Sequence, residues 1–283
     1  MQRYKIIHRT YYNYSAIVKL GTHHLLLRPR ESYELRIESF SLKSTPTAKI
    51  FWHRDVEDNS VAVATFETPT QQLLIESELI IQHYNESPLN FIVSDYAINY
   101  PFKYLANDNF ILSSYMVLPN EETRTLLNNW IYNVYKYNET IQTYTLLQKL
   151  TTYIFKNFTY KVREEAGVQT AKQTLSYGSG SCRDFAFLFM EVVKCLGLAT
   201  RFVSGYLYAP LMSDKVGSTH AWAEVYLPGG GWIGFDPTTG NIAGTDHISV
   251  AVSRLPDNVP PIAGSFLGVS DSNISVGVWV TKV

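Results

Sequence analysis

The sequence predicts an α+β fold in which a β-sandwich-like N-terminal domain is followed by a second, α+β domain. Three patterns along the 283 residues indicate this: alternating apolar and polar runs at the start, apolar residues at helical spacing in the middle, and strand-like runs after the last helix. We place the first domain at residues 1–85 and a connector with a helical segment at 86–140. The second domain is expected at 141–283, with the C-terminal strands completing it. At about 150 residues per domain, the length also favours two domains.

The N-terminal segment is expected to form short strands. Its runs at 5–11, 35–40 and 79–83 are rich in Ile, Thr, Phe and Tyr, and several of them alternate apolar with polar residues. Residues such as Pro29 and Pro46 separate these runs, as turn residues do. Short strands separated by turns are typical of a sandwich, and no residue here belongs to a catalytic motif.

Helices are expected in the middle of the chain, from Pro119 to about Tyr137, over 143–157 and from Cys182 to Leu196. The third is the most strongly periodic, and Gly197 is a suitable residue for its C-terminal end. Strands should follow at 200–207, 220–227 and 232–236.

Composition excludes several classes of protein. The net charge is −1, so no basic excess is present to hold a phosphate backbone, and we expect no nucleic-acid partner. No run approaches the ~18 apolar residues of a membrane span, and we expect no membrane partner. The first residues show no apolar signal region, so we expect a soluble, cytoplasmic protein in a reducing compartment.

The two cysteines have different surroundings. They lie 13 positions apart on one predicted helix, hence about 20 Å apart, and a disulfide between them is excluded because its Cα atoms must lie within ~7 Å. Cys195 lies late in an apolar helix and is expected to be a small buried hydrophobe. Cys182 begins the helix, where unpaired N–H groups and the helix dipole favour a thiolate. It is therefore a candidate nucleophile, and an unreactive residue at the start of the helix is the alternative.

A thiol nucleophile needs a base and a group that orients the base. His220 begins one predicted strand and Asp236 ends the next, with a glycine-rich turn at 228–231 between them. A hairpin centred on Pro228 places the two residues opposite each other, whereas a register shift or a bulge would offset them. The spacing permits the contact without proving it.

Three blocks of sequence resemble the bacterial transglutaminase-like superfamily, whose catalytic core is papain-like. They are Gly180-Ser181-Cys182-Arg183-Asp184-Phe185-Ala186, His220-Ala221-Trp222-Ala223-Glu224-Val225-Tyr226 and Gly231-Trp232-Ile233-Gly234-Phe235-Asp236-Pro237-Thr238. The tails at 246–251 and 257–261 are also similar to the family. The β region at 1–85 resembles the bacterial transglutaminase-like N-terminal region that is often fused to such cores.

The resemblance implies a triad of Cys182 as nucleophile, His220 as base and Asp236 as the group that orients His220. Tyr160 is the candidate for an oxyanion donor by approximate position, although core packing is the simpler role. Trp222 and Trp232 are candidates for the acyl-donor groove, although packing in the hairpin explains them equally well. No cofactor and no metal are implied.

The implied chemistry is acyl transfer on a peptide or carboxamide bond through a thioester on Cys182, with a peptide or protein as substrate. Water as acceptor makes a cysteine protease or amidase, and a lysine makes a cross-linking transglutaminase. We favour hydrolysis, by analogy with microbial members of the family. A non-enzymatic peptide-binding module on the same fold is the second hypothesis, and the oligomeric state is left open.

Alkylation separates the enzyme from the binding module. We expect iodoacetamide to modify Cys182 faster than Cys195 at neutral pH, because the start of the helix favours the reactive thiolate. Peptide mapping by mass spectrometry after timed quenching measures both rates. Equal, slow labelling of both cysteines would favour the binding module.

Overall fold

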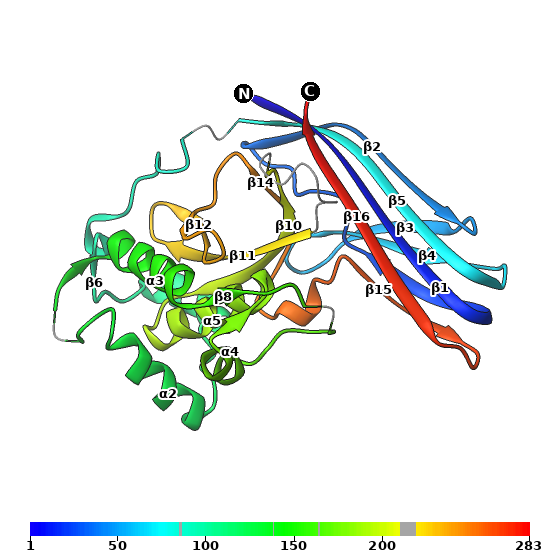
Figure 1. Ribbon diagram of the computed structural model, residues 1–283. Helices are drawn as coiled ribbons and strands as arrows, with labels where there is room; N and C mark the ends of the chain where they lie inside the picture. Colours follow the sequence, from blue (N-terminus) through cyan, green and yellow to red (C-terminus); the bar gives the residue numbers. More distant parts are fainter. Residues whose placement is uncertain (85–86, 138, 164, 210–218) are drawn as a thin grey trace.

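A computed structural model describes residues 1–84, 87–137, 139–163, 165–209 and 219–283 of the chain. It confirms the α+β prediction (Figure 1): long strands form one half of the molecule, and helices packed on a smaller sheet form the other half. Among the described residues, no helix is both long enough and apolar enough to cross a bilayer.

The strand-rich half is a curled seven-stranded sheet. Five of its strands follow the order β2-β5-β1-β4-β3, and the other two, β15 and β16, pair with β1. The first part of β1 pairs with β5 and β16, and its last part pairs with β4 and β15. The same strand therefore passes from one layer to the other, as in a sandwich. The strands are β1 (Gln2–Leu25), β2 (Leu35–Thr45), β3 (Lys49–Arg54), β4 (Ser60–Thr65), β5 (Thr70–His83), β15 (Ile262–Leu267) and β16 (Ser272–Lys282).

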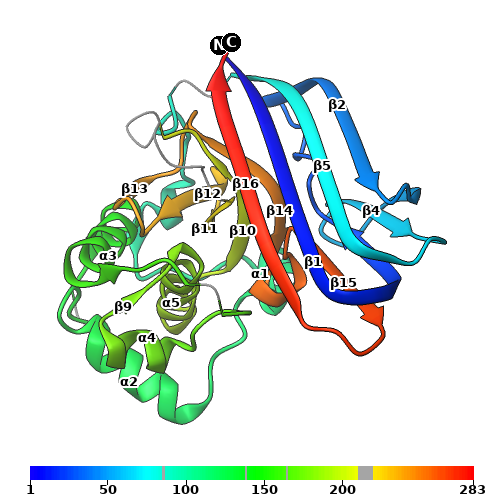
Figure 2. The same cartoon turned by 45° about the vertical axis from the view of Figure 1, so that its right-hand side comes forward.

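The last two strands correct the domain assignment made from sequence. We expected the C-terminal strands to complete the second domain at 141–283, but β15 and β16 return to the N-terminal sheet. β16 pairs with β1 from Tyr4 to Tyr14, which brings the two chain ends side by side (Figure 2). The physical reason is that β5 covers only one edge of the first part of β1, and the other edge is left open for another strand to pair with.

The second half contains a five-stranded sheet in the order β13-β12-β11-β10-β14. Ala221, Ala223 and Val225 of β11 turn to one face and pack with Phe185 and Phe189 of helix α5. The strands are β10 (Thr200–Leu207), β11 (Thr219–Leu227), β12 (Gly231–Asp236), β13 (Asn241–Ile242) and β14 (His247–Ser253). The strands expected at 200–207, 220–227 and 232–236 are confirmed.

Helices surround α5, which carries Cys182 at its first position. The expected helix at 143–157 is confirmed, whereas the one expected from Pro119 begins one residue after Asn120, whose side chain accepts from the Thr123 N–H, and ends six residues early. The helices are α1 (Ala106–Leu112), α2 (Glu121–Ile131), α3 (Thr143–Asn157), α4 (Ala171–Tyr177) and α5 (Cys182–Cys195). Two short strand pairs join β6 (Asn99–Tyr100) to β7 (Ile141–Gln142) and β8 (Thr159–Tyr160) to β9 (Ser179–Gly180).

The two halves share a buried apolar contact. Leu79 and Ile81 of β5 lie in one cluster with Tyr206 of β10 and Ile248 of β14. His8 of β1 also hydrogen-bonds through Nδ1 to the Tyr206 hydroxyl at 3.1 Å. The N-terminal sheet therefore supports the strands of the second sheet that lie nearest to it, including β14.

We expect Leu79→Ala to lower the free energy of unfolding of the whole chain by about 2–5 kcal/mol, because it leaves a cavity in this shared contact. Ile17→Ala is the matched control: Ile17 is also on a strand of this sheet but is 68% exposed, so its loss should change stability by less than about 0.5 kcal/mol. Denaturant unfolding followed by tryptophan fluorescence measures both. Equal effects of the two substitutions would mean that the contact is not part of the cooperative core.

Candidate functional site

Cys182 lies at the first position of α5, directly after the short pair of β8 with β9. Both cysteines are free, as their spacing predicted. The helix start is held by Asp184, whose Oδ2 accepts from the Ser181 N–H and from the Ser181 hydroxyl, both at 2.8 Å. The residue just before Cys182 is thereby fixed to the first turn of the helix.

Asp184 also ties down the loop that precedes this helix. Its Oδ1 accepts from Arg163 Nη1 at 2.6 Å and from the Gln169 N–H at 2.7 Å, and its side chain is fully buried. Burial alone would raise the pKa of Asp184, but these donors outweigh it and hold the pKa below its ordinary value. An acid in the first turn of a helix is also favoured by the helix dipole. The structure adds a role that spacing did not reveal, which is to anchor the backbone around Cys182.

His220 and Asp236 meet, although not as directly opposed residues. The hairpin pairs Ala223 with Phe235 and Leu227 with Gly231, which places Asp236 across from Trp222 and diagonal to His220. A shift by two residues keeps both side chains on one face of the sheet, and diagonal neighbours remain within reach. His220 Nε2 lies 2.8 Å from Asp236 Oδ2.

The electrostatics of this pair favour a charged imidazolium beside a carboxylate. Burial lowers the pKa of His220, but the charge and hydrogen bond of Asp236, together with a hydrogen bond with the Cys182 side chain, raise it to about 10. Burial likewise opposes ionisation of Asp236, but His220 and His247 hold its pKa well below its usual range. Because Nε2 of His220 faces Asp236, Nδ1 is the nitrogen left for the thiol.

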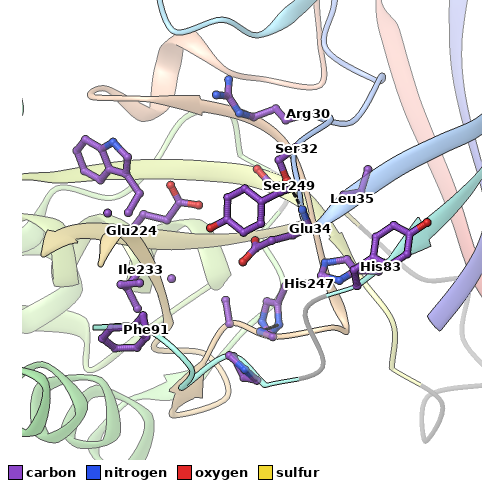
Figure 3. Close-up of a pocket in the computed structure, with 18 of the residues that line it drawn as sticks. Arg30, Ser32, Glu34, Leu35, His83, Phe91, Glu224, Ile233, His247 and Ser249 are labelled. Atoms are coloured by element: carbon purple, nitrogen blue, oxygen red, sulfur yellow. Dashed lines mark hydrogen bonds between the residues drawn. The ribbon is translucent and has the colours of Figure 1, made fainter. Parts of the chain in front are cut away.

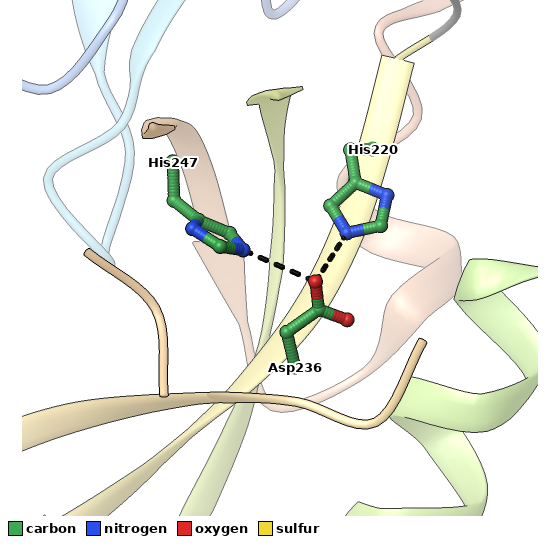
Figure 4. Close-up of side chains that lie close together, drawn as sticks. All are labelled: His220, Asp236 and His247. Atoms are coloured by element: carbon green, nitrogen blue, oxygen red, sulfur yellow. Dashed lines mark hydrogen bonds and ion pairs between the residues drawn. The ribbon is translucent and has the colours of Figure 1, made fainter. Parts of the chain in front are cut away.

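Asp236 has further partners that fix its orientation. Its Oδ1 accepts from the Thr238 N–H at 2.8 Å, and its Oδ2 accepts from the Thr239 hydroxyl at 3.0 Å. His247 Nε2 lies 3.1 Å from the same Oδ2 (Figure 4). In the sequence, His247 stood out only as part of a tail similar to the family, and no role was given to it.

His220, Asp236 and His247 are also a set of side chains that could offer ligand atoms to a metal, since these atoms lie within 4.8 Å of one another. The sequence analysis implied no metal. The pattern of hydrogen bonds around His247 distinguishes a metal site from a hydrogen-bonded network.

Tyr160 lies at the end of β8, paired in register with Gly180, two residues before Cys182. Its side chain is 46% exposed, and its ring is 6.4 Å from that of Phe185. Partial burial and the charges of Cys182 and Asp236 raise the pKa of Tyr160, which keeps its hydroxyl a donor. Its place beside the nucleophile is compatible with the oxyanion role suggested from sequence.

Trp222 and Trp232 were the candidates for the acyl-donor groove, and that role stays a prediction. Trp222 is only 2% exposed and stacks on His220 with ring centroids 6.1 Å apart. Both tryptophans line a cavity of about 720 Å³ between the second sheet and the N-terminal domain, and the lining of that cavity includes His247 but neither Cys182 nor His220 (Figure 3). Trp222 lies on the same face of β11 as His220, because side chains two residues apart in a strand share a face.

Cys195 is half-buried at the end of α5 and packs against the core. Burial, with a contribution from Glu191, raises its pKa to about 11. This thiol is therefore protonated at neutral pH and serves as a natural internal control for Cys182.

Two family models match the chain. The bacterial transglutaminase-like N-terminal region matches residues 4–82, and the transglutaminase-like superfamily core matches residues 134–237, which include Cys182, His220 and Asp236. The chain belongs to the transglutaminase-like superfamily. The resemblance stated from the sequence blocks is therefore confirmed.

Several known proteins are similar to this transglutaminase-like protein. Uncharacterized proteins of Mycobacterium bovis and Mycobacterium tuberculosis are 27% identical over 294 residues, covering 96% of this chain and 90% of their own. An uncharacterized protein of Mycobacterium leprae is 36% identical over 109 residues, 37% of this chain and 38% of its own. The crystal structure of a "putative cysteine protease" from Cytophaga hutchinsonii has a TM-score of 0.77 at 19% identity, and the match covers 100% of this chain and 91% of that one. This last likeness establishes the shared fold.

The raised pKa of His220 has a consequence for stability. Its pairing with Asp236 is fully effective below pH 6.5, the ordinary histidine value, and is lost as the pH rises through about 10. The free energy of unfolding of this transglutaminase-like protein should therefore fall between pH 6.5 and pH 10. Asp236→Asn removes the charge that raises the pKa, so the slope over this window should be smaller in the variant. Denaturant unfolding at several pH values tests this, and parallel slopes would refute the coupling.

Proposed function

We propose that the protein is a cysteine-dependent hydrolase of peptide or carboxamide bonds, with Cys182, His220 and Asp236 as the catalytic triad. The observation that carries the proposal is the position of His220, whose Nε2 lies 2.8 Å from the buried Asp236 carboxylate and whose pKa the neighbouring Cys182 side chain helps to raise. A nucleophile, a base and a group that orients the base are the parts that acyl transfer through a thiol requires.

The steps follow from these contacts. The charged ring of His220 already holds the thiol proton on Nδ1, and the Cys182 thiolate attacks the carbonyl carbon to give a tetrahedral oxyanion. The carbon–nitrogen bond then breaks, and His220 returns its proton to the leaving amine or ammonia, which leaves an acyl thioester on Cys182. Water, deprotonated by His220, attacks this thioester and releases the carboxylic acid and the free thiol.

The surroundings supply the other needs of this mechanism. The carboxylate of Asp236 keeps the ring of His220 in one orientation and stabilises its charged form. The N–H of Cys182 at the start of α5 and the hydroxyl of Tyr160 are the donors that we assign to the oxyanion. Asp184 holds the backbone that carries the first of them.

Water is the acceptor that we favour. Transfer to an amine requires a second groove that admits the amine ahead of water. The similar Cytophaga hutchinsonii protein is named a "putative cysteine protease", and hydrolysis agrees with that name. Transfer to an amine is kept as an outcome of the experiment.

A peptide library that contains glutamine and lysine tests this proposal. We expect wild-type protein to cleave peptides or to convert Gln to Glu, Cys182→Ala to be folded and inactive, and Cys195→Ala, a thiol deletion on the same helix, to remain active. Asp236→Asn should lower kcat/KM by about 10³-fold or more, because the ring of His220 is then held in the wrong tautomer.

Mass spectrometry of the peptides, with and without a primary amine, distinguishes the outcomes. Amine adducts that depend on Cys182 would replace hydrolysis by transglutamination. Turnover that survives Cys182→Ala would overturn the triad. Specific peptide binding without turnover would support the binding-module hypothesis instead.

A further inference from the structure

A second imidazole contacts the carboxylate that orients His220, and the proposed chemistry does not use it. His247 Nε2 lies 3.1 Å from Asp236 Oδ2, the same oxygen that accepts from His220 Nε2 at 2.8 Å. The side chain of His247 is as well buried as that of His220. A buried imidazole beside a catalytic carboxylate requires an explanation.

The other nitrogen of His247 defines its hydrogen-bonding state. The Gly244 backbone N–H donates to His247 Nδ1 at 3.2 Å. A nitrogen that accepts must carry a lone pair, so the neutral ring bears its proton on Nε2. His247 is therefore a donor toward Asp236.

The same observation argues against a metal at these three side chains, although their ligand atoms are close enough to suggest one. A metal-binding histidine donates its second ring N–H to a carbonyl or a carboxylate. Here the second nitrogen faces a donor instead, so binding through Nε2 would force the ring into a tautomer that opposes the Gly244 N–H.

Packing holds His247 in this position. Its ring meets the edge of Trp222 at 5.1 Å between centroids, and Trp222 stacks on His220. The next residue, Ile248, is fully buried in the cluster shared with Leu79 of the N-terminal domain. The N-terminal domain therefore supports β14, the strand that carries His247.

We propose that His247 is a positioning residue that donates from Nε2 to Asp236 Oδ2 and holds the carboxylate in the orientation in which it accepts from His220. This role rests on the proposed function, since it acts through Asp236 and His220 on Cys182. Without this donor, the charge of Asp236 is shared by fewer partners and its carboxylate is less firmly oriented.

Two substitutions separate this role from a local structural one. His247→Gln keeps an N–H at the reach of Nε2, so it can still donate to Asp236, but it loses the contact with Gly244. His247→Asn places its oxygen near the position of Nδ1, so it can accept from Gly244, but it is too short to reach Asp236. If His247 positions Asp236, the His247→Gln variant should be active and the His247→Asn variant impaired. If His247 only supports the turn at Gly244, the opposite result is expected.

The first measurement is the rate of Cys182 alkylation by iodoacetamide across the pH range, read by peptide mapping with Cys195 as internal reference. It needs no substrate and so does not depend on finding one. We expect about a tenfold slower reaction in His247→Asn and a rate within about twofold of wild type in His247→Gln. The alkaline limb of the profile should move to lower pH in the Asn variant alone, because a less firmly oriented Asp236 stabilises the charged ring of His220 less.

The other titratable groups near the pair are the same in both variants. Cys182 and Asp236 face His220, Tyr160 faces Cys182 and Asp236, and His83 and Asp246 adjoin His247. A difference between the Gln and Asn profiles therefore reports the donor to Asp236 and not a change in these neighbours.

The outcomes are distinct from failure of the proposed function. If Cys182 is the faster-labelling thiol but Gln is impaired as much as Asn, or more, His247 has no positioning role even though the triad stands. If wild-type Cys182 is no more reactive than Cys195, the proposed function itself fails. Protection of Cys182 by micromolar Zn²⁺ that is lost in His247→Gln would instead show a metal site and overturn the proposal. A ¹⁵N spectrum of the histidine rings in the wild type should show His247 protonated at Nε2, and protonation at Nδ1 would contradict it.

Discussion

A fully buried carboxylate, that of Asp236, is the group on which the rest of the site depends. Burying a charge costs several kcal/mol unless donors replace the lost water. Here four donors do so: two imidazoles, one hydroxyl and one backbone N–H. They come from β11, from the turn after β12 and from the first residue of β14, so the carboxylate is satisfied only when all three parts of the sheet are in place.

This requirement gives the N-terminal domain a structural part in the site. Its sheet packs on β10 and β14 through Tyr206 and Ile248, and β14 begins with His247. The chain then leaves the second sheet and returns to β1 as β15 and β16. Segments from both ends of the chain therefore form one sheet. This sheet supports β14, the strand whose first residue, His247, contacts Asp236.

On the other side of the site, Asp184 has a similar task. It is also buried and ionised, and its partners are Arg163, Gln169 and Ser181. Gly180 is needed there because a Cβ at this position would lie 2.8 Å from the Asp184 Cβ. Two buried carboxylates thus fix the two halves of the site: one holds the backbone before the nucleophile, and the other holds the base.

Local features were predictable from the sequence, and long-range partners were not. The periodicity around Phe185 and Phe189 defined the helix that begins at Cys182, and strand alternation put His220 and Asp236 on one face. The predicted hairpin register differed from the observed one by two residues, because the turn is centred on Gly229 and not on Pro228. The glycines of this segment are compatible with either turn, so they do not specify the register. The destination of β15 and β16, the contacts of His247 and the hidden face of Trp222 all depend on segments far apart in the chain, whose pairing no local pattern specifies.

The protonation of His220 tests the central claim most directly. In ¹⁵N-histidine-labelled protein, the ring nitrogens report the charge of each imidazole as the pH is changed, and His220→Gln identifies the signal. Our account predicts that His220 stays protonated through neutral pH, titrates near pH 10, and does so only when Asp236 is present. A ring of His220 that titrates near pH 6.5, or one unaffected by Asp236→Asn, would contradict it.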